Sequence, residues 1–164
     1  QEDKFLTFPL AEEEYGIDIR HVTEIVGIQN ITGLPDAPLY VRGVINLRGK
    51  VIPVIDVRIR FAMEARDYDD RTCVIVVDVE DSSVGLIVDS VSEVIEIPKA
   101  NIEPAPSVRN GKGSDFIWGL GKVDNEVMIL LNTQALIYSS DLEMVIKKID
   151  CEYQGEDNSC GLNN

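Results

Sequence analysis

His21 is the only histidine of this sequence, so a nucleophilic site of the Ser-His-Asp or Cys-His kind would have to use it. Such chemistry needs an imidazole beside a hydroxyl or thiol and a carboxylate that orients the ring. Residues 85–97 resemble residues 16–28, and Ser90 occupies the position equivalent to His21. This substitution favours a structural surface role for His21, and no catalytic residue is predicted.

Residue types that bind metals occur without the spacing that metal sites need. There is no histidine pair and no Cys-x-x-Cys pair, and the acidic run at 67–70 lacks the glycine and terminal glutamate of a calcium loop. No metal and no cofactor are therefore predicted. The odd number and wide spacing of Cys73, Cys151 and Cys160 argue against a disulfide framework and favour a reducing, cytoplasmic setting.

The charge balance narrows the class of partner. The 164 residues carry 15 Lys and Arg against 29 Asp and Glu, a formal net charge of −14. This excess repels nucleic-acid phosphates, and the apolar runs are far shorter than the roughly 20 residues of a membrane span. With 45% apolar residues, the chain can bury one ordinary core or two small fused ones. A protein partner is therefore favoured over nucleic acid or direct membrane insertion.

Two halves of the chain resemble each other. Gly16 aligns with Gly85, and further on Gly43 aligns with Gly119, with similar aliphatic neighbours in the same order. The second offset is larger because of a Pro- and Gly-containing stretch at 102–115, which is predicted to be a loop. The sequence thus predicts two copies of one unit, at about 4–61 and 73–137.

Within each copy the pattern is mostly that of short strands. Brief β-branched segments bounded by Gly, Pro, Asp or Asn predict strands at 5–8, 15–19, 42–47 and 51–55. Tight hairpin turns are predicted at 48–49 and, in the second copy, at 124–125.

Helices are predicted at three places. A short helix is expected over 20–25, repeated over 89–94, and a longer one over about 140–149 with a Ser/Asp cap and lysines in its last turn. Residues 1–149 are interpreted as one domain, followed by an acidic, flexible tail at 150–164.

The central segment 41–58, VRGVINLRGKVIPVIDVR, resembles the signature of the bacterial chemotaxis coupling proteins, the CheW family. EYGIDI at 14–19, GLIVDSVSEV at 85–94 and GLGKVD at 119–124 are similar to companion segments of that family. The resemblance covers about residues 4–148, and the acidic tail falls outside it.

The resemblance implies a mainly β fold of two intertwined SH3-like five-stranded barrels, related by the internal duplication, with short helices and a C-terminal helix. It also implies a non-enzymatic adaptor. In that role the chain joins the cytoplasmic tip of methyl-accepting chemotaxis receptors to the regulatory domain of the chemotaxis histidine kinase. The implied location is cytoplasmic, with recruitment to membrane receptor arrays.

The family's receptor contact lies around the groove between the barrels, near the first short helix and the Arg-Gly turn. By motif position it carries over to Val22, Glu24, Gly43, Leu47 and Arg48. Arg48 offers planar donors for carboxylates or carbonyls, whereas Val22 and Leu47 supply either an apolar floor or part of the core. No motif places the kinase contact.

Asp124 replaces Arg48 in the second copy, which indicates a role specific to the first. Two other hypotheses stay open at this point. One is the coupling domain of a larger adaptor or of the kinase itself. The other is a small ligand-binding or hydrolytic barrel that uses His21.

Overall fold

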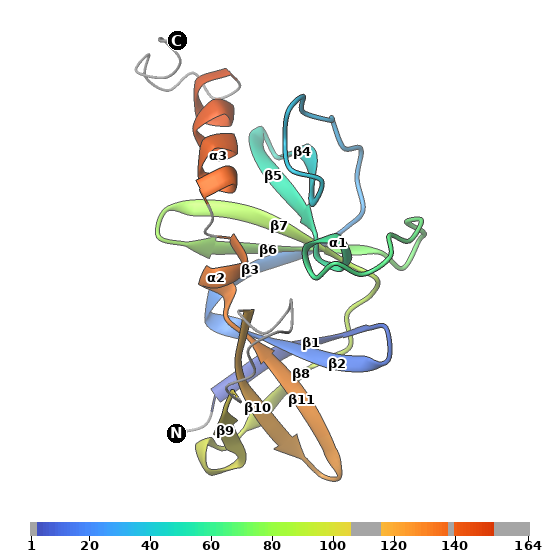
Figure 1. Ribbon diagram of the computed structural model, residues 1–164, viewed down its shortest axis with the longest axis vertical. Coiled ribbons are helices and arrows are strands. Elements are labelled where there is room, and N and C mark those ends of the chain that lie inside the picture. Colours follow the sequence, from blue (N-terminus) through green and yellow to red (C-terminus); the bar gives the residue numbers. More distant parts are fainter. Residues whose placement is uncertain (1–2, 106–115, 138–139, 153–164) are drawn as a thin grey trace.

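The computed structural model describes residues 3–105, 116–137 and 140–152 (Figure 1). The first repeat contains β1 (Asp3–Leu10), β2 (Glu13–Asp18), η1 (Ile19–His21), β3 (Val22–Gly27), β4 (Val41–Leu47), β5 (Lys50–Asp56) and α1 (Val57–Arg60). The second contains β6 (Cys73–Val79), β7 (Ser82–Val88), β8 (Val94–Ile97), η2 (Lys99–Asn101), β9 (Ile102–Pro104), β10 (Ile117–Val123), β11 (Glu126–Leu131) and α2 (Thr133–Ile137). The helix α3 (Ser140–Glu152) follows.

The strands form two mixed sheets that exchange hairpins between the repeats. One sheet has the order β8-β1-β2-β11-β10-β9, and the other has the order β3-β6-β7-β5-β4. The β1–β2 hairpin of the first repeat therefore lies in the sheet built mostly by the second repeat, and the β6–β7 hairpin does the reverse. This exchange is the intertwining of the two SH3-like barrels, and the mainly β prediction is confirmed.

The pairing register recurs in both sheets. Val54 of β5 pairs in parallel with Gly85 of β7, and the equivalent Leu130 of β11 pairs in parallel with Gly16 of β2. The same backbone ladder is therefore built twice, which is what two copies of one unit require.

The two short helices predicted at 20–25 and 89–94 are wrong. After the single turn η1, the chain enters β3, whose β-branched Val22, Ile25 and Val26 pair with β6. In the second repeat the chain is extended, because Ser92 N–H donates to Thr7 O and Thr7 N–H donates to Glu93 O, each at 2.8 Å. Both errors have one cause: the partner strand comes from the other repeat.

The stretch 102–115, predicted to be a loop, begins with a strand. β9 pairs with β10 and makes one sheet six-stranded, where five strands were expected in each barrel. The other sheet has only an isolated bridge, between Thr32 and Val44, at the corresponding edge. Residues 106–115 lie outside the described part of the chain.

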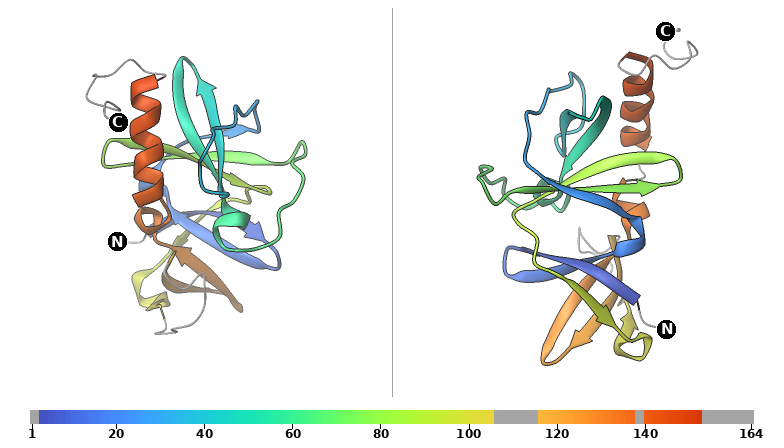
Figure 2. Two further views of the ribbon diagram at one scale, coloured as in Figure 1. Left: turned by 45° about the horizontal axis from the view of Figure 1, so that its top comes forward. Right: turned by 180° about the vertical axis from the view of Figure 1, so that it is seen from behind.

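The C-terminal helix extends three residues beyond the predicted end at 149. Its apolar face buries Leu142, Val145 and Ile149, and Figure 2 shows α3 standing beside the β4–β5 hairpin. Cys151 in its last turn is disulfide-bonded, whereas Cys73 is a free thiol. The odd cysteine total therefore carries no weight against a disulfide, and that inference was wrong. The rest of the predicted tail lies outside the described residues.

One apolar core joins the two barrels. Four aromatic rings lie in contact one after another through this core. The distances between ring centroids are 5.9 Å for Phe8 and Tyr15, 5.6 Å for Tyr15 and Phe61, and 5.5 Å for Phe61 and Phe116. Each sheet also has a smaller core of its own, around Ile52 and Val74 in one and around Phe5 and Leu130 in the other. A shared core fixes the barrels relative to each other, so a site that uses both of them keeps its shape.

Candidate protein-binding site

The β4–β5 hairpin presents Arg48 at its tip. Leu47 pairs with Lys50 across a two-residue turn in which Arg48 and Gly49 have φ of +52° and +89°. Gly49 N–H donates to Asn46 Oδ1 at 2.8 Å, which holds the turn. Two positive φ values match the twist of the flanking strands, so the predicted hairpin is confirmed. The Arg48 side chain is 68% exposed.

The structure brings Arg48 and Glu24 together in an ion pair. Glu24 lies on β3, and β3 and β4 are the two edge strands of the five-stranded sheet. The pair therefore links the two edges that lie farthest apart in the order of this sheet. Because an exposed ion pair contributes only about 0–1 kcal/mol to stability, its main effect is to orient the guanidinium.

Val22 and Leu47 are half-buried. Val22 packs against the core shared by the barrels, and Leu47 packs against the smaller core of the five-stranded sheet. Val22 and Glu24 lie on a strand and not on the helix that the sequence predicted. Both apolar residues are therefore part of the core wall while keeping some surface.

Gly43 fixes the path of the backbone beside this hairpin. It has φ of +144°, and a Cβ there would lie 2.1 Å from Thr32 O. The contact is close because Thr32 and Val44 exchange backbone hydrogen bonds of 2.8 and 2.9 Å. Gly119 plays the same part in the second barrel, where a Cβ would lie 2.9 Å from Glu103 O. Gly43 thus shapes the site through its backbone.

The β10–β11 hairpin of the second barrel has the opposite charge. Asp124 occupies the first turn position with φ of +56°. A neighbouring pocket of about 430 Å³ is lined by Asp124 together with Glu14, Glu93 and Glu126. Burial, followed by repulsion from Glu126 and Glu93, raises the pKa of Glu14 above its ordinary value. This surface suits a cation or the basic side chains of a protein.

His21 lies in η1 and lines a pocket of about 330 Å³ with Asp18, Trp118 and Thr133. The Asp18 carboxylate accepts hydrogen bonds from Arg20, which hold its pKa below the ordinary value. Among the described residues, His21 Nδ1 has no hydrogen-bond partner. No group of three His, Cys, Asp or Glu side chains in the described part of the chain is arranged to hold a metal ion.

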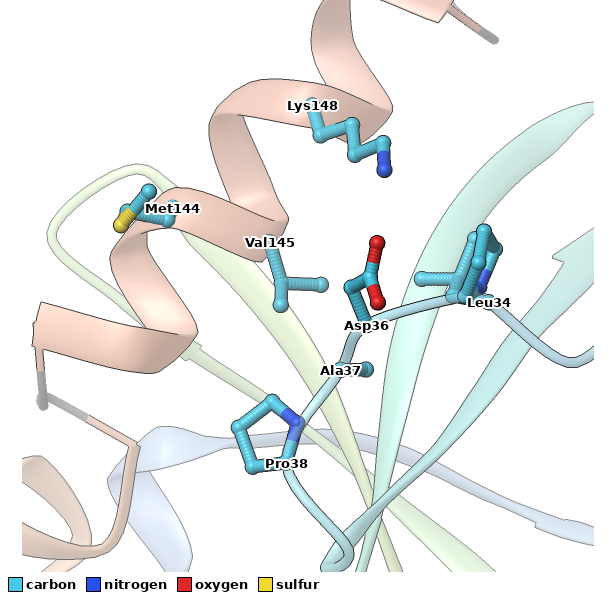
Figure 3. A pocket seen from close by; sticks show the side chains of 8 residues that line it. Leu34, Asp36, Ala37, Pro38, Met144, Val145 and Lys148 are labelled. Atoms are coloured by element: carbon cyan, nitrogen blue, oxygen red, sulfur yellow. The ribbon is translucent and has the colours of Figure 1, made fainter.

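Two surfaces were missed by sequence reasoning. A pocket of about 410 Å³ lies between α3 and the loop before β4, lined by Leu34, Asp36, Val145 and Lys148 among others (Figure 3). A group of arginines also meets Asp89 between the barrels. A signal for the second existed, because six of the eight arginines fall within residues 42–71 of an acidic chain. Within the described residues, no helix is long and apolar enough to cross a membrane.

Comparison with known proteins agrees with this architecture. The family model described as a CheW-like domain matches residues 4–141. The chemotaxis protein CheW of Klebsiella aerogenes is 38% identical over 142 residues, which cover 87% of this chain and 86% of that protein. The chemotaxis protein CheW of Treponema pallidum is 34% identical over 144 residues, 85% of each chain.

A solved structure is similar as well. The crystal structure of the scaffolding protein TtCheW from Thermoanaerobacter tengcongensis superposes with a TM-score of 0.78 at 39% identity. The match covers 86% of this chain and 96% of that one. From the domain match, the identities and the shared two-barrel fold, the chain belongs to the CheW-like family of chemotaxis proteins.

Proposed function

We propose that this protein is a non-enzymatic adaptor that couples methyl-accepting chemotaxis receptors to the chemotaxis histidine kinase. Receptor binding is supported mainly by Arg48, an exposed arginine that adopts a left-handed turn conformation and forms an ion pair with Glu24. Its counterpart in the second barrel is Asp124, in the same conformation.

The conformation argues for a functional arginine. A left-handed backbone costs an ordinary residue about 1–2 kcal/mol, and Asn, Asp and Gly tolerate it best. Asp124 therefore suits its turn, whereas Arg48 is a poor choice for the same geometry. Because an exposed pair with Glu24 returns only a fraction of this cost, turn stability does not explain the arginine. A contact made by its guanidinium to a partner does.

The receptor-binding surface we propose is Val22, Glu24, Gly43, Leu47 and Arg48. The receptor tip is a helical hairpin, and a helix docks by placing apolar side chains in a groove while polar groups fix its position. Arg48 and Glu24 supply the polar contacts, Val22 and Leu47 the apolar ones, and Gly43 the backbone path that sets the hairpin. The kinase regulatory domain binds a second surface, which we leave unassigned.

Coupling then depends on simultaneous binding and requires no chemical step. An adaptor that holds two partners raises their effective concentration at each other without a direct contact between them. The protein acts in the cytoplasm and is recruited to receptor arrays through its receptor-binding surface.

Calorimetric titration tests this function directly. The chain is titrated separately with a receptor-tip helical hairpin and with the kinase regulatory domain. We expect saturable binding to each, with receptor binding lost or weakened in Arg48→Ala. A chain that is folded by circular dichroism but binds neither partner would contradict the proposal.

A further inference from the structure

A small basic pocket lies between the two barrels of this acidic protein. Its volume is about 160 Å³, and it is lined by the β1–β2 hairpin, by α1 and by the loops that follow α1 and β7. Pro9 and Ala11 of the β1–β2 hairpin form one side, and Arg58 of α1 lies opposite with Arg66, Arg71, Asp89 and Ser90. In Figure 1, α1 and the loop that follows it face the β1–β2 turn.

Two arginines are held in place by one carboxylate. Arg58 donates from Nε and Nη2 to the two oxygens of Asp89 at 2.8–3.1 Å, and Arg66 donates from Nη1 to Asp89 Oδ2 at 3.0 Å. The Arg58 and Asp89 side chains are each only 17% exposed. Arg58 and Asp89 therefore form a largely buried ion pair at the floor of the pocket. Arg66, whose side chain is 53% exposed, also contacts Asp89.

The third arginine adds charge that the pocket does not compensate. Arg71 is exposed, and its backbone N–H donates to Asp69 Oδ1 at 2.8 Å, which fixes the loop that carries it. Among the residues that the structure describes, its guanidinium makes no ion pair. Asp69 also lies 3.6 Å from Arg66. Among the residues that line this pocket, three are arginines and one, Asp89, is a carboxylate; Asp69 lies at the margin, in a chain whose net charge is −14.

We propose that this arginine pocket, formed by Arg58, Arg66 and Arg71, binds the carboxylate of a Glu or Asp side chain of a protein partner. Arginine presents paired donors in one plane, which match the two oxygens of a carboxylate. The volume accommodates one carboxylate with its neighbouring methylenes. A doubly charged phosphate is disfavoured, because Asp89 and Asp69 stand beside the site and the whole chain is acidic.

The first test uses a probe that is independent of any partner. N-acetylglutamate, used as its α-amide so that the side-chain carboxylate is its only charged group, is titrated at low salt while the arginine side-chain Nε–Hε signals are followed by NMR. We expect saturable shifts of the Arg66 and Arg71 signals in the millimolar range, and no saturable shift with N-acetylglutamine, which is also used as its α-amide and is therefore neutral. Equal responses to both compounds would overturn the proposal, and so would tighter binding of inorganic phosphate than of N-acetylglutamate.

Substitutions locate the effect. Arg66→Gln and Arg71→Gln should each weaken N-acetylglutamate binding several-fold while leaving the Arg58–Asp89 ion pair intact. Lys147→Gln, which removes the same charge from the exposed side of α3, is the matched control and should leave the affinity unchanged. If the control weakens binding as much as the pocket variants do, net charge explains the response and the pocket does not.

The second test identifies the partner and rests on the proposed function. The double variant Arg66→Gln/Arg71→Gln should bind the receptor-tip hairpin about tenfold more weakly than the native chain and Lys147→Gln do. Unchanged receptor affinity would show that the receptor does not supply this carboxylate, even if the small probe binds. If the native chain fails to bind the receptor at all, the proposed function fails, whereas the N-acetylglutamate titration still decides the pocket.

Discussion

The β4–β5 and β10–β11 hairpins share a pattern of strand pairing and differ in charge. Each has a two-residue turn whose first residue adopts a left-handed conformation, and each follows a glycine that lets another segment approach. One carries an arginine paired with a glutamate, and the other carries an aspartate beside a carboxylate-lined pocket. The strand pairing and the left-handed first turn residue are therefore what both copies retain, whereas the side chains at the turns differ in charge.

Replacing Gly43 or Gly119 by alanine should lower the free energy of unfolding by different amounts. Gly43→Ala places a Cβ 2.1 Å from a backbone oxygen at a positive φ, so we expect the free energy of unfolding to fall by about 3 kcal/mol or more. Gly119→Ala meets Glu103 O at 2.9 Å without a positive φ and should cost about 1–2 kcal/mol. Urea denaturation measures both values.

Gly49→Ala provides the control for backbone strain alone. It has φ of +89° with nothing within 4 Å of a Cβ, so a loss of about 1 kcal/mol is expected. If Gly43→Ala costs no more than Gly49→Ala, the close approach of Thr32 is not what requires the glycine.

Reversing the turn charges should sharpen the functional difference. Arg48→Asp is expected to weaken receptor-hairpin binding by about 1–3 kcal/mol because it removes the guanidinium and places two carboxylates side by side. The thermal midpoint should change little, since the turn geometry favours aspartate at this position. Isothermal calorimetry and a thermal melt give the two values.

Asp124→Arg is the matched reversal in the second barrel. The measurement is made at an ionic strength high enough to screen the general effect of added positive charge. Under that condition the receptor affinity should change by no more than about twofold. Equal changes in affinity for the two variants would mean that overall charge, and not the first hairpin, governs receptor binding.

The acidic pocket of the second barrel predicts a smaller, pH-dependent effect. Burial and neighbouring carboxylates raise the pKa of Glu14, so the folded state disfavours its ionised form. This penalty is present at neutral pH and disappears as the pH falls through the raised pKa. Glu14→Gln should therefore raise the urea midpoint slightly at pH 7, and the difference should shrink toward pH 4.

Glu12→Gln removes the same charge from an exposed position in the β1–β2 turn. It should leave the urea midpoint nearly unchanged at both pH values. A difference between Glu14→Gln and the native chain that persists undiminished at pH 4 would mean that the carboxylate charge is not the cause.

Much of the fold follows from local patterns. The strands near 5–8, 42–47 and 51–55 and both hairpin turns are marked by β-branched residues and by turn residues close in sequence. The helices predicted at 20–25 and 89–94 failed because β3 pairs with β6 and the segment before β8 bonds to β1. Such long-range partners override a helical pattern of a few residues.

The candidate site was predictable in part for a similar reason. Arg48 and its turn follow from a motif of neighbouring residues, and the duplication singles out Asp124 for comparison. Arg48 and Glu24 are 24 residues apart in sequence, and Asp89 lies 31 residues from Arg58 and 23 from Arg66. The pairing of strands that are distant in sequence brings these charges together.

Sedimentation velocity of a three-component mixture tests the adaptor function most directly. The receptor-tip hairpin and the kinase regulatory domain are mixed with and without this chain. We expect the two partners to sediment together only when the chain is present, and Arg48→Asp to release the receptor hairpin while the kinase domain stays bound. Displacement of one partner by the other would contradict coupling through two separate surfaces.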